Sequence, residues 1–402
     1  MHIGLISETF WPDINGVSMT LAQWSQGLLD AGDQLDLITP HAHADTVGLE
    51  GIPWQDAKPF RHISASRVPL PGYRGVKLGL MLPKAAKRLW RKSPPDVLYI
   101  ATEGLLGLDA LRYGRQNGIP VVGGFHTNFQ YYLHHYHLQW LTPLMRAYLR
   151  RFHNACTRTL TPTQAKKNQL LRQKYHRIHR VGRGVDLSQF YPRTTQERSL
   201  WRQQHGISDD TLLLGYTGRL AAEKNLSQWI ESYQILKSQH PSPVKALIVG
   251  DGPWRDHVLS ALPDALWLGE LTGEALAIAY SAMDIFSFPS MTETYGNVVP
   301  EALASGTPVI AFDCAAAHEL LQPGKNGDCI GVNEAEDYTA RLIHLAHDYQ
   351  QSPQRWRTAS AKSIHHLGWP TVNASFRRHL VQAIHEVKRH GRQRSDFVAT
   401  KS

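Results

Sequence analysis

The sequence has little cysteine, no long apolar run and no excess of acidic residues. Its 3 cysteines, Cys156, Cys314 and Cys329, lack the close pairing of a zinc site. An odd, sparse set of cysteines favours a reducing compartment. No uninterrupted apolar stretch reaches the ~20 residues that a membrane-spanning helix needs. These absences argue against a disulfide-stabilised secreted protein, a zinc-binding module and an integral membrane protein.

The basic residues are concentrated in the first half of the chain. Residues 1–190 hold 23 Lys and Arg against 12 Asp and Glu, and the whole chain carries a formal charge of +9. Such a half is typical of proteins that meet an anionic partner. We do not expect nucleic acid, because the sequence contains no helix-turn-helix, zinc or RNP-like motif.

The length of 402 residues suits two domains. Apolar strand-like runs alternate with helical segments throughout, which predicts an α/β protein with parallel sheets. The predicted strands are 2–8, 34–39, 97–101, 120–125 and 159–162, followed by 212–217, 246–249, 265–268, 284–288 and 308–312. We expect a first domain at 1–188, a second at 189–369, a helix at 370–390 and a disordered tail at 391–402.

The most informative segment runs from Ser290 to Val309. Glu293 and Glu301 lie eight residues apart, between two apolar runs that predict buried strands. This places Glu293 at the carboxyl end of a parallel strand and Glu301 about a turn inside the following helix. Ligands of open α/β sheets bind at this edge, where helix N-termini favour phosphate and carboxylates accept hydrogen bonds from hydroxyls. Phosphate and hydroxyls together indicate a nucleotide sugar, although the spacing alone also fits two surface residues.

Cations and a glycine follow other predicted strands. Arg219 and Lys224 lie in the strand-to-helix segment 215–225, where fixed cations can stabilise a departing diphosphate. Gly16 ends the loop that begins at Glu8, and a glycine there lets the backbone approach a phosphate. His126 follows the strand 120–125. The histidines at 134, 135 and 137 have no accompanying carboxylate, so we expect no metal site.

These segments resemble the signatures of the retaining glycosyltransferases of family 4. The matching elements are E-x7-E at Glu293 and Glu301, G-R-x-x-x-x-K at 218–224, and F-H-T at 125–127. The resemblance implies the GT-B fold, which has two Rossmann-like domains, a deep interdomain crevice and a C-terminal helix that crosses back to the first domain. It also implies catalysis without a metal or other cofactor.

The same resemblance assigns roles to individual residues. Glu301 is expected to accept hydrogen bonds from ribose, Glu293 from the donor sugar, and Arg219 and Lys224 to bind the diphosphate. The catalytic set is His126, Arg219, Lys224 and Glu293. The donor-binding set is Gly16, Arg219, Lys224, Glu293, Tyr295, Gly296, Asn297, Val298 and Glu301. No protein base is required, because a donor phosphate oxygen is thought to take the acceptor proton.

The predicted reaction is transfer of a hexose, of mannose or glucose type, from a nucleoside diphosphate sugar to an acceptor hydroxyl. The resemblance points to GDP-mannose or a UDP-hexose as donor and to a lipid or glycan as acceptor, with a membrane lipid or glycolipid favoured. A GT-B sugar-nucleotide epimerase and a non-catalytic nucleotide-sugar-binding protein are the alternatives. The base, the sugar, the linkage, the oligomeric state, and the roles of Asn15 and the loop 315–319 stay open.

The segment 81–92 predicts where the enzyme works. Its basic residues recur at helical spacing on one face. They are Lys84, Lys87, Arg88, Arg91 and Lys92. We expect a cytoplasmic protein attached peripherally to the anionic inner face of the cytoplasmic membrane, with an ordinary solvated helix face as the alternative.

Overall fold

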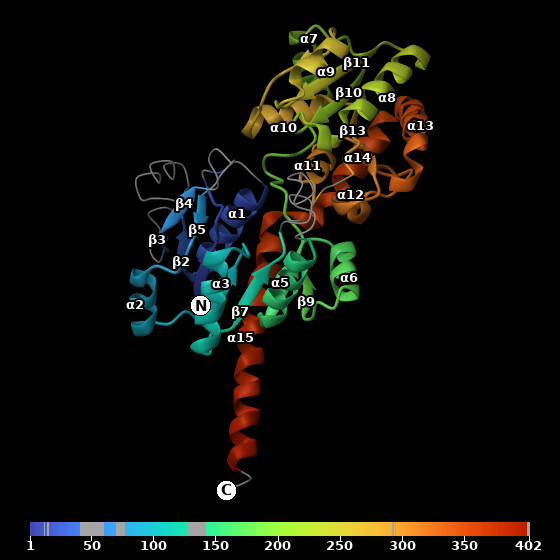
Figure 1. Cartoon of the computed structure of the whole chain (residues 1–402). Helices are drawn as coiled ribbons and strands as arrows, with labels where there is room; N and C mark the ends of the chain where they lie inside the picture. The colour runs from blue at the N-terminus through green and yellow to red at the C-terminus, as the bar shows by residue number, and fades with distance from the viewer. Residues whose placement is uncertain are drawn as a thin grey trace. The chain divides into compact units, whose positions relative to one another are not determined.

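The computed structural model describes residues 1–11, 13, 16–40, 60–69, 77–126, 142–291, 293 and 295–399. The chain divides into two compact units, one formed by Met1–Gly182 with Pro370–Ser402 and the other by Arg183–Trp369. Each unit contains a parallel sheet flanked by helices (Figure 1). The predicted α/β class with two parallel sheets is confirmed.

The sheet of the first unit has the strand order β3-β2-β1-β6-β7-β8-β9, and every neighbouring pair is parallel. Its central strands are buried on both faces and read as continuous apolar runs. The strands are β1 His2–Ile6, β2 Gln34–Thr39, β3 Phe60–Ser64, β6 Val97–Ile100, β7 Val121–Gly124, β8 Arg158–Thr161 and β9 Ile178–Arg180. A separate antiparallel pair is formed by β4 Arg67–Pro69 and β5 Lys77–Gly79.

Helices connect successive strands of this sheet. They are α1 Gly16–Asp30, α2 Lys84–Lys92, α3 Leu105–Gln116, α5 Thr142–Ala155 and α6 Gln164–Arg172. Because each strand is parallel to its neighbours, the helix that leads into a strand ends at the amino edge of the sheet, opposite the edge where ligands of such folds bind. The two ends of these helices therefore belong to different surfaces of the unit.

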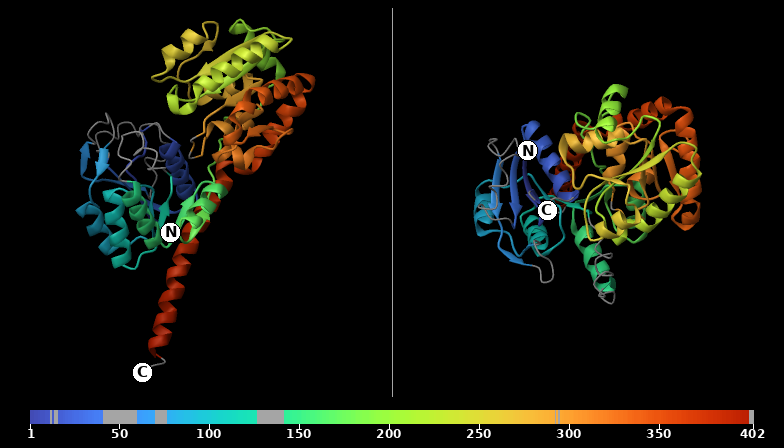
Figure 2. Two further views of the ribbon diagram at one scale, coloured as in Figure 1. Left: turned by 45° about the vertical axis from the view of Figure 1, so that its right-hand side comes forward. Right: turned by 90° about the horizontal axis from the view of Figure 1, so that it is seen from above.

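The last helix, α15 (Trp369–Ala399), packs on the first unit. The rings of Trp24 and Phe376 stack with their centroids 4.1 Å apart, and Arg377 Nε lies 2.7 Å from Asp33 Oδ2. Both views of Figure 2 show α1, in blue, beside the upper part of the red α15. The predicted return of the C-terminal helix is confirmed, and the helix continues to Ala399, past the predicted end at residue 390.

The sheet of the second unit has the order β12-β11-β10-β13-β14-β15, again with all neighbours parallel. Its strands are β10 Leu212–Thr217, β11 Val244–Val249, β12 Leu266–Trp267, β13 Ile285–Phe288, β14 Val309–Phe312 and β15 Gly327–Ile330. Its helices are α7 Thr195–Gln204, α8 Leu226–Gln239, α9 Arg255–Ala261, α10 Gly273–Ala282, α11 Val298–Ala304, α12 Ala315–Leu320, α13 Tyr338–Gln351 and α14 Pro353–Ile364.

The second unit begins at Arg183, earlier in the chain than the boundary we expected between residues 188 and 189. Val185 and Phe190 are buried in its hydrophobic core. In addition, the Val185 amide donates a 3.0 Å hydrogen bond to the Leu367 carbonyl. The segment from Arg183 to the predicted boundary therefore contributes to the second core.

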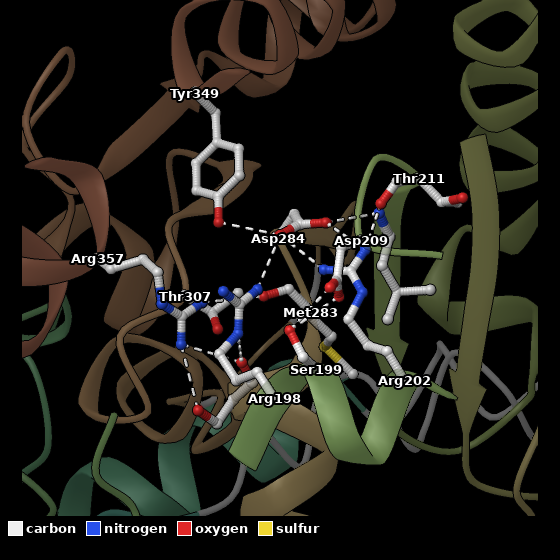
Figure 3. Close-up of polar contacts among 12 residues, drawn as sticks. Arg198, Ser199, Arg202, Asp209, Thr211, Met283, Asp284, Thr307, Tyr349 and Arg357 are labelled. Carbon is white, nitrogen blue, oxygen red and sulfur yellow. Dashed lines mark hydrogen bonds and ion pairs between the residues drawn. The ribbon is translucent and has the colours of Figure 1, made fainter. Parts of the chain in front are cut away.

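A buried ionic cluster ties α7, α13 and α14 to the start of β13 (Figure 3). Asp284 Oδ1 accepts hydrogen bonds from Arg198 Nη2 at 2.8 Å and from Tyr349 Oη at 3.0 Å, while Arg202 Nη2 lies 3.1 Å from Oδ2. Nearby, Arg357 donates to the carbonyls of Ser281 and Met283. Burial alone would raise the pKa of Asp284, but Arg202 and Arg198 overcome it and the pKa is lowered.

Candidate active site

Lys224 and Glu293 meet at the carboxyl edge of the second sheet. β10 and β13 are hydrogen-bonded neighbours, so the segments that follow them lie side by side. Lys224 ends the short 3₁₀ helix η3 (Ala222–Lys224), which follows β10, and Glu293 follows β13. Lys224 Nζ forms an ion pair with Glu293 Oε1, with the two side chains 21% and 15% exposed. Two residues that are far apart in the sequence are thus brought into direct contact.

Further contacts hold this pair in place. Ser290 Oγ donates a 2.8 Å hydrogen bond to Glu293 Oε1, and Lys224 Nζ lies 5.8 Å from the centre of the Phe288 ring. The remaining exposure leaves the pair accessible to a ligand. A bound diphosphate can attract Lys224, and sugar hydroxyls can donate to Glu293.

Arg219 has a fixed backbone and an exposed side chain. Tyr216 Oη donates to the Arg219 carbonyl at 3.1 Å, and the Leu220 amide donates to the Asp251 carbonyl at 2.9 Å. The turn at Gly250–Pro253 supports this loop, since a Cβ on Gly252 would lie 2.3 Å from the Leu220 carbonyl oxygen. The Arg219 side chain is 67% exposed, and its Nη1 is 3.9 Å from Glu223. It is therefore not part of the Lys224–Glu293 pair.

Glu301 lies in α11 and contacts a buried tyrosine. Tyr280 Oη donates a 3.0 Å hydrogen bond to Glu301 Oε2. Burial raises the pKa of Glu301 to about 7, and the hydrogen bond from Tyr280 only partly opposes this shift. The carboxyl group is thus poised between its neutral and ionised forms near neutral pH. A hydroxyl that donates to it favours the ionised form.

The residues between the two glutamates have different roles. The Tyr295 ring is buried, and its Oη donates to the Arg183 carbonyl at 3.3 Å. Arg183 Nη1 in turn donates to Asn297 Oδ1 at 3.4 Å. Gly296 has a φ of 83°, a conformation that favours glycine and turns the chain into α11, where Val298 is the first residue. The Tyr295 side chain therefore packs within the unit, while Gly296 shapes the turn between the glutamates.

In the first unit, His126 follows β7 and its ring is buried. Tyr99 Oη and His126 Nε2 share a 2.5 Å hydrogen bond, and the Trp24 ring centroid lies 5.6 Å away. His126 thus belongs to the aromatic cluster that includes Phe376 of α15. Gly16 is the first residue of α1, at the end of the loop that follows β1. Asn15 lies outside the described residues.

Two carboxylates of the first unit were not predicted from the sequence as site residues. Glu8 follows β1, and burial together with the charge of Glu103 raises its pKa to about 7. Its Oε1 has no hydrogen-bond partner among the described residues. Glu103 follows the neighbouring β6 and pairs with His153 Nε2 at 3.0 Å. Glu8 begins the strand-to-helix loop in which only Gly16 received a role, so its position after a strand was the available signal.

Tyr280 and Ser290 were not predicted from the sequence either. Tyr280 donates a hydrogen bond to Glu301, and Ser290 donates one to Glu293. Ser290 stands in the informative segment, but no spacing rule predicts its hydrogen bond. Over the described residues, no group of three or more His, Cys, Asp or Glu is placed to hold a metal ion. In the same part of the chain, no helix has the length and apolarity to cross a membrane.

Comparison with known proteins agrees with this geometry. Residues 14–189 match the model of Glycosyltransferase Family 4, and residues 197–363 match that of Glycosyl transferases group 1. The chain is 32% identical over 378 residues to a GDP-mannose-dependent alpha-mannosyltransferase of Mycolicibacterium smegmatis, covering 92% of this chain and 95% of the relative. It is 27% identical over 378 residues to the alpha-monoglucosyldiacylglycerol synthase of Acholeplasma laidlawii, covering 90% and 91% of the two chains.

A solved structure supports the fold. Sucrose-phosphate synthase from Thermosynechococcus elongatus superposes with a TM-score of 0.73 over 95% of this chain and 98% of that chain, at 17% identity. This likeness, with the two parallel sheets and the returning helix α15, confirms the predicted GT-B fold. The chain belongs to the glycosyltransferases of family 4, enzymes that transfer a hexose from a nucleotide sugar.

Proposed function

We propose that this enzyme transfers a hexose of mannose or glucose type, with retention of configuration, to a hydroxyl group of a membrane lipid or glycolipid. The ion pair between Lys224 and Glu293 carries the proposal, because it joins a phosphate-binding cation to a hydroxyl-binding carboxylate at one sheet edge. The names of two relatives, a GDP-mannose-dependent mannosyltransferase and a glucosyldiacylglycerol synthase, support GDP-mannose as donor and a lipid as acceptor.

In this proposal, the second unit binds the donor. Glu301 accepts hydrogen bonds from ribose and Glu293 from the sugar, while Lys224 and the exposed Arg219 neutralise the diphosphate as it departs. A donor phosphate oxygen takes the acceptor proton. His126 and Gly16 remain proposals based on the family resemblance. The non-catalytic alternative predicts loss of Arg219, Lys224 or His126, and all three are present.

Substitution of the cations tests these roles. We expect Arg219→Ala and Lys224→Ala each to lower kcat by roughly 10²–10³, because each cation acts on charge that develops in the transition state. Lys237→Ala is the matched control, since Lys237 is an exposed lysine of the same unit that pairs with Asp264. Steady-state kinetics with saturating donor measure the effect. A rise in KM with an unchanged kcat would refute the assignment.

The same kinetic assay tests independence from metal ions. We expect activity to persist in EDTA, because protein cations supply the charge that a divalent ion supplies in other transferases. Strict dependence on added Mg²⁺ or Mn²⁺ would contradict this role for Arg219 and Lys224.

The exposed face of α2 supports attachment to an anionic membrane. The apolar side of this segment is used for packing, because Leu82, Ala86 and Trp90 are buried and Trp90 Nε1 donates to Asp36 at 2.8 Å. Lys87 is paired with Asp109 at 2.8 Å. The basic side chains left exposed are Lys84, Arg88, Arg91 and Lys92. Each basic residue near an anionic surface contributes about 1 kcal/mol to binding.

A further inference from the structure

A second basic surface of the first unit is a groove between α3, α5 and the segment before β9. The groove has a volume of about 460 Å³ and is lined by Arg115, Arg150, Arg151, Asn154, Ala155 and Arg177. We call it the arginine groove. A neighbouring groove of about 330 Å³ shares Arg150 and adds Arg146, Arg172 and Lys174. These volumes are in the range of small-molecule sites.

The arginine groove lies at the amino edge of the sheet of the first unit. Arg115 is in the last turn of α3, which leads into β7, and Arg151 is near the end of α5, which leads into β8. Arg177 directly precedes β9. All three positions belong to the amino edge of the sheet, whereas Glu8 and His126 follow strands at the carboxyl edge. The groove is therefore separate from the residues assigned to catalysis.

The guanidinium groups of the groove belong to exposed residues and have no acidic partner among the described residues. Some other arginines of the chain do bind carboxylates, as Arg158 binds Glu386 and Arg193 binds Glu274. Within the described part of the chain, Arg115, Arg150 and Arg151 form no ion pair or hydrogen bond with a carboxylate. Basic residues at helix ends are favoured by the helix dipole, but this effect does not require several of them to converge on one cavity.

Hydrogen bonds fix the backbone beside the groove. Asn154 accepts a 2.8 Å hydrogen bond from the His176 amide at Oδ1, and its Nδ2 donates to the Lys174 carbonyl at 3.0 Å. Arg177 Nη2 donates to the Asn154 carbonyl. Lys174 and Arg177 have φ values of 64° and 56°, which favour glycine. The chain therefore keeps basic side chains at two strained positions that border the two grooves, and such strain clusters at functional sites.

We propose that the arginine groove binds a phosphate-bearing anion. Guanidinium groups present paired N–H donors that match phosphate oxygens, and several of them suit an anion with at least two negative charges. This inference is independent of the donor site, because every residue of the groove belongs to the first unit and lies at the amino edge of its sheet. The phosphate can come from a soluble metabolite or from a lipid headgroup.

Calorimetric titration of the whole protein with inorganic pyrophosphate tests the proposal. Two classes of site are expected, one in the donor site and one in the groove. Arg115→Gln/Arg150→Gln is expected to weaken the groove class by about 10²-fold, since each lost charge-assisted hydrogen bond is worth about tenfold. Arg219→Ala/Lys224→Ala is expected to remove only the donor class. Because each double variant removes a different class of pyrophosphate site, the proposal for the groove and the proposal for the donor site can fail independently.

Arg112→Gln/Arg378→Gln is the matched control, because it removes two exposed arginines of the same unit that line neither groove and lie outside α2. It is expected to retain both classes of pyrophosphate site.

Sedimentation with phosphatidylglycerol vesicles distinguishes the source of the phosphate. A loss of vesicle binding in the groove variant assigns a lipid headgroup, and its retention with loss of pyrophosphate binding assigns a soluble anion. If the groove variant changes neither binding, the proposal is wrong.

Discussion

At the scale of single residues, the candidate site consists of groups whose charge is controlled by a neighbour. Glu293 is paired with Lys224 and bound by Ser290, whereas Glu301 faces the uncharged hydroxyl of Tyr280. The first carboxylate therefore has a cationic partner, whereas burial raises the pKa of the second to about 7. The two glutamates of one motif differ in electrostatic environment, which suits contact with different parts of a donor.

The raised pKa of Glu301 predicts pH-dependent nucleotide binding. In the proposed donor site, ribose hydroxyls donate to the Glu301 carboxylate, so the affinity for GDP is expected to rise with pH and to level off above about 7. The gain is at most about tenfold per pH unit. Calorimetry at a series of pH values measures the affinity for GDP in wild type and in Glu301→Gln. Because Glu301→Gln cannot ionise at this position, it reports the pH dependence that comes from ionisation of GDP itself. Identical curves for the two proteins would remove Glu301 from the nucleotide site.

Glu293→Gln provides the contrast to Glu301→Gln. It is expected to spare binding of GDP and to weaken binding of GDP-mannose, because Glu293 is assigned to the sugar. Calorimetry with both ligands on both variants measures this division of roles. Equal losses for both ligands in both variants would contradict it.

Asp284 is predicted to be a stability residue and not a catalytic one. Asp284→Asn leaves Arg198 and Arg202 buried without their counter-charge, so a loss of about 3–5 kcal/mol in unfolding free energy is expected. Urea denaturation measures it, with Asp209→Asn as the control because Asp209 is exposed. Since the folded pKa of Asp284 is lowered, its contribution is present above its unfolded pKa near ~3.9 and is lost as pH falls further. A cost for Asp284→Asn no larger than that of the control would refute the assignment.

A charged side chain that directly follows an apolar run can be located from the sequence. Glu293 and Lys224 were each expected soon after a strand of the second domain, and the structure joins them in an ion pair. The same pattern does not identify Asp284, which was included in a predicted strand but begins a buried ionic cluster with α7 and α13. The partners of that cluster are far apart in the sequence, and no local pattern connects them.

At the scale of elements, the central strands were predictable, whereas of the edge strands only β12 was predicted, as 265–268. The predicted strand 212–217 coincides with β10, whose residues are all buried, because strands of parallel sheets that are covered on both faces read as apolar runs. β3 and β9 at the edges of the first sheet were missed. Their sequences, Phe60–Ser64 and Ile178–Arg180, mix apolar with basic residues, since an edge strand is partly exposed.

Ala315 stands at a sharp turn that leads into α12. Ala315 is the first residue of α12 and has a φ of 50°, so the alanine occupies a conformation that favours glycine. The chain therefore keeps the left-handed turn at an energetic cost, although the role of the loop toward the acceptor stays a proposal.

The exposed basic residues of α2 are predicted to bind an anionic membrane. Arg88→Gln/Arg91→Gln/Lys92→Gln is expected to reduce sedimentation with anionic vesicles at low salt, because three of the exposed basic residues are removed. Lys87 is left unchanged, so that Asp109 keeps its partner. Neutral phosphatidylcholine vesicles are the control. If wild type and variant both stay in the supernatant with anionic vesicles, the basic face of α2 is only solvated.

At the scale of the whole molecule, the two units divide the chemistry by charge. The first half of the chain carries the basic excess, including the α2 face and the arginine groove, while the second unit contains the paired cations and carboxylates of the donor site. The two parallel sheets could be predicted from the alternation of apolar runs, and the returning helix from the resemblance to the family. The groove could not, because it gathers arginines from α3, α5 and the segment before β9 that share no motif.

Transfer of radiolabelled hexose tests the central claim most directly. The whole protein is incubated with membrane lipids and either GDP-[¹⁴C]mannose or UDP-[¹⁴C]glucose in the presence of EDTA, and label in the organic phase is counted. We predict transfer from GDP-mannose in wild type and in Lys237→Ala, and a loss of roughly 10²–10³ in initial rate in Lys224→Ala. Absence of labelled lipid with both donors, or undiminished transfer by Lys224→Ala, would contradict the account.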